Sequence, residues 1–409
     1  MKYYVESYGC TMNYGEGDRL SERMGAMGHE SVAAVEEADI VILNTCTVVD
    51  TTEKRMLRRM SDLRRMGKEV IVAGCMAKVQ SGRIDIRLPG CLIIPPDEYG
   101  DFSSAVQGRY GCGCSPASEN AVGNIIPIAQ GCLGDCSYCI TKFARGRLKS
   151  YPEEEIFDRF GRMVDSGVKE VLVTAQDSAC YGLDRGTDLV GLLRGMLEKE
   201  GDYRIRVGMM NPNMLEPISN GVAEIFDDPR VYRFLHVPVQ SGSDSILEAM
   251  NRRYTADRFM TLVGKMRSRH PDISIATDII SGFPGETDAD HEASVRLIEE
   301  LRADTVNITR FSARPGTEAA DMEQVHGRVA KERSARLTEV KNRVETEVNS
   351  ESVGKRFRIL VTEQGKPGTV IARTANYRPV AIASDLPIGS FADAEITGCA
   401  STYLIGRML

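Results

Sequence analysis

The chain has 409 residues, 42% of them hydrophobic and 27% charged, and its formal net charge is −7 at pH 7. These values are ordinary for a globular protein of two or three domains. The N-terminus has no apolar signal region and no apolar run reaches membrane-spanning length, so we expect a cytoplasmic protein with no membrane partner. The acidic total argues against nonspecific binding to nucleic acid and against DNA as a partner, but it leaves room for a site-specific contact.

The chain contains eleven cysteines. In a reducing compartment, so many cysteines argue for metal or redox chemistry rather than for disulfides. Six of them fall into two sets of three. The sequence assigns no role to the others, which are Cys91, Cys112, Cys114, Cys180 and Cys399.

The first ~118 residues predict a small open α/β domain. Strand-like runs at 2–7, 39–44 and 69–73 alternate with helical patterns at 16–27 and 52–66. Cys10, Cys46 and Cys75 each follow the carboxyl end of one of these strands. Ligands of an open parallel sheet bind in the crevice outside those strand ends, so we expect the three thiols to converge there on one cluster. The alternative is three separate buried thiols, since cysteine is a common core residue.

The second helical pattern carries a run of basic side chains. It fits either a solvated helix face or a contact for an acidic partner. Its members are Lys54, Arg55, Arg58, Arg59, Arg64, Arg65 and Lys68.

A linker of Gly, Ser and polar residues follows, at about 100–124. Cys112 and Cys114 stand there as Cys-x-Cys, a spacing too close for a usual zinc site. We expect these two thiols to bind no metal.

The second set of cysteines is Cys132-x-x-x-Cys136-x-x-Cys139. Three thiolates can hold a four-iron cluster and leave one iron open to bind and activate a small molecule. A structural zinc site, which usually has a fourth ligand nearby, and incidental thiols are the alternatives. The spacing resembles the signature of the radical S-adenosylmethionine (SAM) enzymes.

From residue 124 to about 311 the sequence alternates strand and helix patterns. Six strands are expected, and the pattern predicts an incomplete (β/α)6 barrel of parallel strands, in which chemistry sits at the carboxyl ends. The strands are expected at 125–129, 170–174, 204–208, 232–239, 274–280 and 305–309. Four side chains at or near these strand ends, or beside the cysteine triplet, are candidates for holding SAM: Tyr138, Gln176, Arg206 and Gln240. Packing of Tyr138 and hydrogen bonding at the barrel rim are equally consistent readings.

A polar helix at about 329–347 leads to a tail with four short β-like runs, at 357–362, 369–373, 380–383 and 392–397, separated by Gly, Pro and Asn turns. A small β-barrel is the natural prediction. Such barrels often bind RNA, although interaction with the rest of the chain is an alternative. Basic and aromatic side chains suited to an unstacked RNA loop are Arg356, Arg358, Arg373, Tyr377 and Arg378.

Nearly the whole chain resembles the radical-SAM methylthiotransferases. The similar blocks are ESYGCTMN (6–13), NTCTV (44–48) and AGCMA (73–77), the central triplet, HVPVQSGS (236–243), TDIISGFPGET (277–287) and RFSARPGT (310–317). The resemblance implies an N-terminal cluster domain at 1–118, a radical-SAM domain at 119–348 and a TRAM RNA-binding domain at 349–409. It also implies two [4Fe–4S] clusters, with SAM bound at the cluster on Cys132, Cys136 and Cys139 and the inserted sulfur delivered at Cys10, Cys46 and Cys75.

Four further blocks look most like the branch that acts on N6-threonylcarbamoyladenosine in tRNA: TCTVVDTTEKR (45–55), CITKFARG (139–146), VGMMNPN (207–213) and FLHVPVQS (234–241). This implies methylthiolation of C2 of that base at position 37, beside the anticodon, with the anticodon stem-loop and an electron donor protein as partners. Related branches act on isopentenyl-adenosine in tRNA or on an aspartate of a ribosomal protein, and both stay open as alternatives. A noncatalytic iron–sulfur RNA-binding protein is a remoter one.

Overall fold

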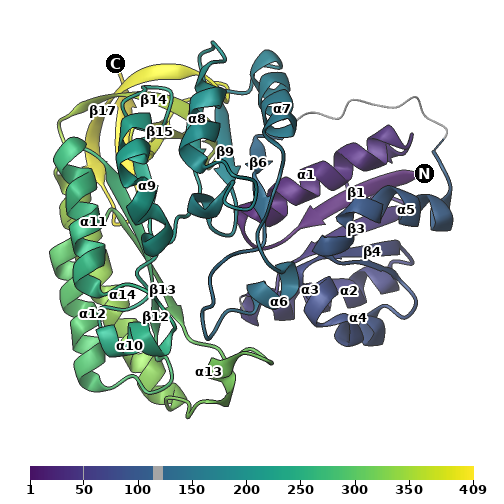
Figure 1. Ribbon diagram of the computed structural model, residues 1–409. Helices are drawn as coiled ribbons and strands as arrows, with labels where there is room; N and C mark the ends of the chain where they lie inside the picture. The colour runs from purple at the N-terminus through teal and green to yellow at the C-terminus, as the bar shows by residue number, and fades with distance from the viewer. Residues whose placement is uncertain (49, 114–122) are drawn as a thin grey trace. The chain divides into compact units, whose positions relative to one another are not determined.

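The structure is a computed structural model that describes residues 1–48, 50–113 and 123–409 (Figure 1). The chain forms two compact units. The first comprises Met1–Gly134, Cys139–Ser166 and Thr174–Gln176, and the second comprises Asp135–Tyr138, Gly167–Val173 and Asp177–Leu409. Cys114 lies outside the described residues. No helix within the described ranges is both long and apolar enough to cross a membrane.

The N-terminal part of the first unit is a five-stranded sheet in the order β2-β1-β3-β4-β5, with every neighbouring pair parallel. Its strands are β1 (Lys2–Ser7), β2 (Glu30–Ser31), β3 (Ile40–Thr45), β4 (Glu69–Gly74) and β5 (Leu92–Ile94). Its helices are α1 (Thr11–Ala26), α2 (Asp50–Arg65), α3 (Cys75–Val79), α4 (Ser81–Arg87) and α5 (Phe102–Tyr110). The predicted open α/β domain is therefore confirmed, with two short edge strands added.

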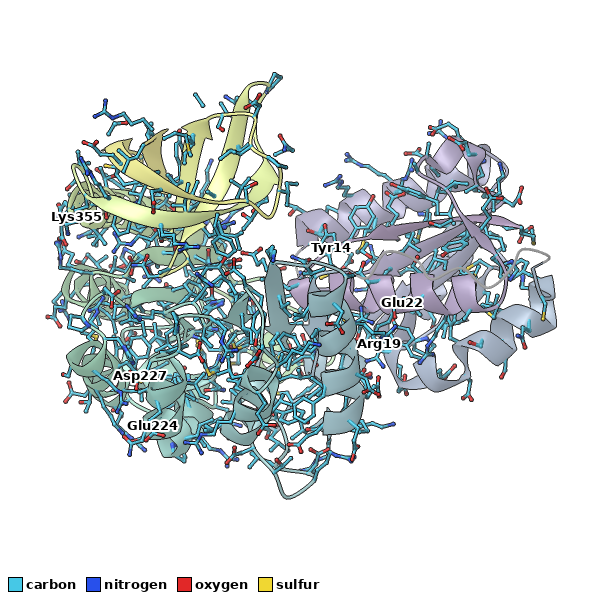
Figure 2. The ribbon with its side chains drawn as sticks, turned by 90° about the horizontal axis from the view of Figure 1, so that it is seen from above. Tyr14, Arg19, Glu22, Glu224, Asp227 and Lys355 are labelled. Atoms are coloured by element: carbon cyan, nitrogen blue, oxygen red, sulfur yellow. The ribbon has the colours of Figure 1, made fainter. Side chains whose placement is uncertain are left out.

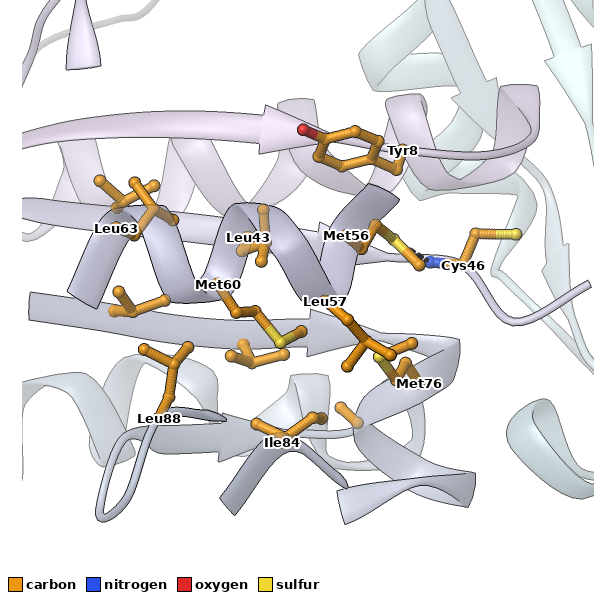
Figure 3. Close-up of a cluster of buried hydrophobic side chains, with 14 of the residues drawn as sticks. Tyr8, Leu43, Cys46, Met56, Leu57, Met60, Leu63, Met76, Ile84 and Leu88 are labelled. Atoms are coloured by element: carbon orange, nitrogen blue, oxygen red, sulfur yellow. Dashed lines mark hydrogen bonds between the residues drawn. The ribbon is translucent and has the colours of Figure 1, made fainter. Parts of the chain in front are cut away.

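Alternation along the central strands builds a core on each face of this sheet, because successive strand side chains point to opposite faces. Val41 and Leu43 of β3 join the cluster that α2 and α4 cover, whereas Ile40 and Ile42 join the cluster that contains residues of α1 and α5. Figure 3 shows the first cluster, of which Cys46 is a member. A strand buried on both faces reads as a continuous apolar run, and β3 does.

The first unit also holds β6 (Ile125–Pro127), β7 (Ala129–Gln130), α6 (Thr141–Arg145), β8 (Lys149–Ser150) and α7 (Glu153–Asp165). Two ion pairs fasten α7 to α1, on which Figure 2 labels Arg19 and Glu22. Arg19 pairs with Glu155, and Arg159 donates to Glu22 at 2.8 Å. The segment after the cysteine triplet is thus anchored on the N-terminal helix.

The second unit continues the alternation of parallel strands and helices. The strands are β9 (Glu170–Thr174), β10 (Arg204–Val207), β11 (Phe234–His236), β12 (Ser274–Ser281) and β13 (Thr305–Arg310). The helices are α8 (Leu189–Leu197), α9 (Pro212–Ile225), α10 (Asp244–Ala249), α11 (Ala256–Arg269) and α12 (Asp288–Leu301). β9 pairs with β10, and β11, β12 and β13 form a second ladder. Between the ladders there is an isolated parallel bridge from Ile205 to Val231, so the predicted barrel wall is interrupted there.

The C-terminal part of the second unit follows α13 (Glu318–Asp321) and α14 (Gly327–Ser350) and is a closed barrel in the order β14-β15-β16-β18-β17. Its strands are β14 (Arg356–Gln364), β15 (Thr369–Thr374), β16 (Pro379–Ala383), β17 (Phe391–Cys399) and β18 (Leu404–Met408). Val361, Val370, Val380, Ile396 and Leu404 are among its buried core. The predicted small β-barrel is confirmed. The sequence missed β18, which closes the barrel, because only Leu404 of that strand is buried.

Candidate functional site

Cys10, Cys46 and Cys75 lie at one edge of the N-terminal sheet. They follow β1, β3 and β4, which are neighbours in the sheet, and the register pairs Ser7 with Asn44 and Thr45 with Gly74. Neighbouring strands are about 4.8 Å apart, so three loops that leave adjacent strands at the same level stay close. The sheet thus places the three thiols at the edge where open α/β sheets bind ligands.

Two glycines allow these loops to approach one another. Gly9 has a φ of +105°, and a Cβ there would lie 2.6 Å from Cβ of Cys46 and 2.8 Å from its Sγ. Gly74 has a φ of +87°, and a Cβ there would lie 2.2 Å from the carbonyl oxygen of Thr45. Since side chains avoid both this backbone region and such distances, any other residue would push the cysteine loops apart.

Asn13 at the start of α1 joins the same loops. Its side-chain amide donates to the carbonyl oxygens of Tyr8 at 2.7 Å and Thr45 at 2.9 Å. The residue is fully buried. One side chain therefore fixes the backbone just before Cys10 and just before Cys46.

The guanidinium of Arg145, on α6, is a buried charged group at this edge. Its Nε donates to Sγ of Cys75 at 3.2 Å, and its Nη2 donates to Asn13 at 2.6 Å and to Glu16 at 2.8 Å. Nη1 also donates to Glu16. The side chains of Arg145 and Glu16 are 1% and 2% exposed. The sequence analysis missed Arg145, Glu16 and Asn13, since no local pattern marks a polar residue whose partners are distant in sequence.

Burial strongly affects the thiol of Cys75. It raises the pKa of Cys75 to about 12, with Arg145 opposing and the neighbouring Cys10 and Cys46 adding to the rise. A bare thiol would therefore stay protonated at neutral pH, and a thiolate at this position needs positive charge beside it. Iron or another metal would supply that charge.

The donor set fits an iron–sulfur cluster. Thiolates are the ligands that such clusters use, and three of them leave one iron of a four-iron cluster open. Within residues 1–48, 50–113 and 123–409, no three His, Cys, Asp or Glu side chains are gathered closely enough for a single metal ion.

The second set of cysteines lies in the loop between β7 and α6, and all three side chains are partly exposed. Cys132 and Cys139 belong to the first unit and Cys136 to the second. The backbone N–H of Gly134 donates to Sγ of Cys132 at 3.1 Å. That this set binds a cluster stays a prediction.

Residues beside Cys136 are anchored within the second unit. Ser137 Oγ donates to the carbonyl oxygen of Ala249 at 2.7 Å, and Arg252 donates to the hydroxyl of Tyr138 at 2.7 Å. The ring of Tyr138 meets Phe283 edge-on at 6.2 Å. Tyr138 therefore packs within the second unit, and its contact with SAM stays a prediction.

The other SAM candidates differ in how they are held. Oε1 of Gln176, just past the end of β9, is buried and accepts no hydrogen bond from the described residues. Gln240 has a φ of +74°, and its backbone bonds to Asp278 and Ile280 of β12. A non-glycine residue in this region is strained, and such strain often marks functional sites. Arg206 lies over the rings of Phe234 at 5.2 Å and Tyr377 at 5.7 Å, and burial lowers its pKa.

The imidazole of His236 is held by a carboxylate. Its Nε2 lies 3.0 Å from a carboxylate oxygen of Asp278, whose other oxygen accepts from Asn307 at 2.7 Å. Burial alone would raise the pKa of Asp278, but the hydrogen bond and charge of His236 lower it. This partly exposed network links residues of β11, β12 and β13.

Three of the five tail residues proposed for RNA are engaged within the chain. Arg373 donates to Glu363 at 2.8 Å, and Arg378 to Ser352 at 2.8 Å and to Asp304. Tyr377 packs its ring against Tyr232 at 4.8 Å and Phe234 at 5.0 Å. The contacts of Tyr377 and the pair of Arg378 with Asp304 join the barrel to the β/α core, whereas Arg373 and Glu363 both lie in the barrel. Arg356 and Arg358 are exposed.

Comparisons with known proteins divide the chain in the same order as its elements. Residues 2–93 match the Uncharacterized protein family UPF0004, residues 126–298 match the Radical SAM superfamily and residues 351–409 match the TRAM domain. These matches define a radical SAM protein with an additional domain on either side. The fold agrees: a radical SAM methyltransferase, TsrM from Kitasatospora setae, superposes with a TM-score of 0.59 at 16% identity, over 78% of this chain and 76% of that one.

Relatives are similar over the full length. The probable threonylcarbamoyladenosine tRNA methylthiotransferases of Pyrococcus abyssi and Archaeoglobus fulgidus are 40% and 38% identical, covering all of this chain and 100% and 99% of theirs. The human threonylcarbamoyladenosine tRNA methylthiotransferase is 36% identical over 89% of this chain and 66% of its own. The chain belongs to the family of threonylcarbamoyladenosine tRNA methylthiotransferases, and the resemblance seen in the sequence is confirmed.

The packing of Tyr377 gives a first prediction. Tyr377→Ala should lower the free energy of unfolding by about 2 to 4 kcal/mol, because it removes a ring packed between the barrel and the core. Arg356→Ala, on the exposed face of β14, should change it by less than about 0.5 kcal/mol. Urea denaturation followed by circular dichroism measures both. If Tyr377→Ala kept full stability and instead lost RNA affinity, Tyr377 would be an RNA contact.

Proposed function

We propose that this protein methylthiolates C2 of N6-threonylcarbamoyladenosine at position 37 of tRNA, giving 2-methylthio-N6-threonylcarbamoyladenosine. The observation that carries the proposal is the gathering of Cys10, Cys46 and Cys75 at one sheet edge in a chain that also has the Cys132, Cys136 and Cys139 triplet. Full-length similarity to the threonylcarbamoyladenosine branch supports the substrate. With tRNA as substrate, we place the reaction in the cytoplasm.

Two [4Fe–4S] clusters and SAM are the cofactors of this proposal. Cys132, Cys136 and Cys139 would hold the cluster that binds SAM, and Cys10, Cys46 and Cys75 would hold the one at which sulfur is delivered. The bound clusters and SAM supply one-electron chemistry, which the reaction needs because an aromatic C2–H offers no acidic proton to a side-chain base. The chain itself contributes the placement of the base and the exclusion of water.

Residues of the β/α core would orient SAM. The unpartnered Oε1 of Gln176 can accept from an amine or hydroxyl group, and the strained Gln240 presents its side-chain amide beside a strand end. Arg206 is a cation that can meet a carboxylate. Tyr138, already held by Arg252 and Phe283, would bound the site rather than bind SAM by its hydroxyl.

We propose that tRNA also contacts α2. A hollow of about 520 Å³ lies beside this helix and is lined by Glu6, Tyr8, Thr51, Lys54, Arg55, Arg58, Arg59 and Asp62. Arg59 forms an ion pair with Glu6 at 2.9 Å, and Lys54 forms one with Asp50 at 2.6 Å. Arg55 lies over the ring of Tyr8 at 5.2 Å, and Arg58 is exposed. Arginines in such a position suit backbone phosphates, because their planar forks donate two parallel hydrogen bonds.

Two cysteine variants separate the roles of the two sets. Cys132→Ala should abolish reductive cleavage of SAM. Cys10→Ala should leave that cleavage intact but stop sulfur insertion, since its cluster lies in another part of the chain. Chromatography of 5′-deoxyadenosine and of the digested tRNA measures the two steps. Sulfur insertion by Cys10→Ala would contradict the proposed division.

The reaction itself can be tested directly. Protein reconstituted anaerobically with iron and sulfide, then given SAM, a chemical reductant in place of the electron donor protein, and tRNA bearing threonylcarbamoyladenosine, should yield the 2-methylthio nucleoside by mass spectrometry. Product on isopentenyl-adenosine or on a ribosomal protein would select one of the other branches. Cluster assembly without product on any of these substrates would favour a noncatalytic protein.

The α2 contact predicts a salt effect. Arg58→Gln should weaken tRNA binding and reduce the slope of log K against log salt concentration by about 1, the value for one lost phosphate contact. Arg64→Gln is the matched control, since Arg64 is also exposed on α2 but does not line the hollow. Filter binding at several salt concentrations measures both. Equal slopes for the two variants would remove α2 from the RNA surface.

A further inference from the structure

We propose that Arg145 is a positioning residue for the site of Cys10, Cys46 and Cys75, and that its guanidinium sets the reduction potential of the cluster held there. This inference rests on the proposed function, in which those three thiols bind a cluster. It concerns a residue outside both cysteine sets.

The first argument is geometric. The planar guanidinium is fixed on one side by two bonds to Glu16 and on the other by its bond to Asn13. This leaves Nε–H directed at Sγ of Cys75, 3.2 Å away. Arg145 and Glu16 are almost completely buried, so the orientation is set by packing and not by water. A lysine could supply the charge but not this fork of fixed donors.

The second argument is electrostatic. A cluster with three thiolates carries negative charge that grows by one on reduction, and burial makes that charge costly. Hydrogen bonds to the ligand sulfurs and nearby positive charge favour the reduced form and so raise the potential. Arg145 provides both at Cys75. Glu16 works in the opposite direction, because its carboxylate offsets part of the guanidinium charge.

The third argument is the place of Arg145 in the chain. It lies six residues after Cys139, on α6, and α6 packs against α3, the helix that begins with Cys75. The segment that carries the last cysteine of the triplet is therefore joined through one side chain to a ligand of the other set. Arg147, two residues further on, is exposed, unlike the buried Arg145 beside Cys75.

The test uses a full-length protein that holds only the N-terminal cluster. Cys132, Cys136 and Cys139 are all changed to Ala, and the remaining cluster is reconstituted anaerobically. Iron and sulfide are counted, the fold is checked by circular dichroism, and the midpoint potential is measured by optical and paramagnetic-resonance redox titration. Into this background go Arg145→Lys, Glu16→Gln and the double variant Arg145→Gln with Glu16→Gln, with Arg147→Gln as the matched control.

Opposite shifts are expected. Glu16→Gln should raise the midpoint potential of the cluster. Arg145→Lys should lower the ratio of reduced to oxidised cluster about tenfold at a given solution potential, which corresponds to a midpoint potential lower by about 59 mV for one electron. The double variant should fold, since both buried charges are removed together, and should also have a lowered potential because the bond to Cys75 is gone. Arg147→Gln should match the parent.

A purely structural salt bridge would give another pattern. Folded Glu16→Gln and double variants with the potential of the parent would overturn the inference, even if Arg145→Lys failed to fold. Failure of the premise taken from the proposed function, that these three thiols bind a cluster, would look different, because the parent with only Cys10, Cys46 and Cys75 would then bind no four-iron cluster at all.

Discussion

The N-terminal part of this protein depends on one buried ion pair, between Arg145 and Glu16. Taking two charges out of water costs several kcal/mol for each ion, and an interior pair recovers this only when its geometry is excellent and its remaining donors are bonded. Arg145 meets both conditions, since it donates to Glu16, Asn13 and Cys75. As a stabilising device, such a pair gains little over packed apolar side chains. Its value here is that it fixes where α1, α3 and α6 meet, and that meeting point is the cysteine edge of the sheet.

The sheet explains why that edge is available. Parallel strands end at one level, and the order β1-β3-β4 makes three consecutive strand ends neighbours although their cysteines are about 30 residues apart in sequence. Adjacent strand ends are not sufficient, because side chains at positions 9 and 74 would keep the loops apart. Gly9 and Gly74, both at positive φ, remove the side chains that would collide with Cys46 and Thr45. Asn13 then ties two of the loops through backbone carbonyl oxygens. The sheet therefore positions the three cysteine loops, the two glycines let the loops approach one another, and the Asn13 amide holds two of them in place.

These features differ in how far the sequence could reveal them. β3 could be predicted because Ile40, Val41, Ile42 and Leu43 form an unbroken apolar run, and the run also indicates a strand covered on both faces. The placement of Cys46 follows from it. β18 could not be predicted, because only Leu404 of this strand is buried in the barrel and Gly406 and Arg407 break the apolar pattern that marks a strand. Arg145 is the clearest limit: in sequence it is one of several basic residues after Cys139, and only tertiary packing distinguishes it from the exposed Arg147. Residue type and local spacing are enough to locate the cysteines that could bind a cluster. Which charged residue contacts those cysteines depends on burial, which only the folded structure shows.

The same distinction governs how an acidic chain can take an RNA substrate. Net charge is a poor guide at contact distance, because salt of about 0.15 M screens exposed charges beyond about 8 Å. What matters is which cations remain unpaired at the surface. In the tail, Arg373 is neutralised by Glu363 within the barrel, and Arg378 is neutralised by Asp304, which holds the barrel on the core. Their charge is therefore not available to a phosphate. On α2, Arg58 is exposed, and Arg55 is held over an aromatic ring that leaves its edge open. Among the described residues, Arg55 and Arg58 are not committed to a carboxylate in this way, and this favours the proposed contact of tRNA with α2, the helix that follows Cys46.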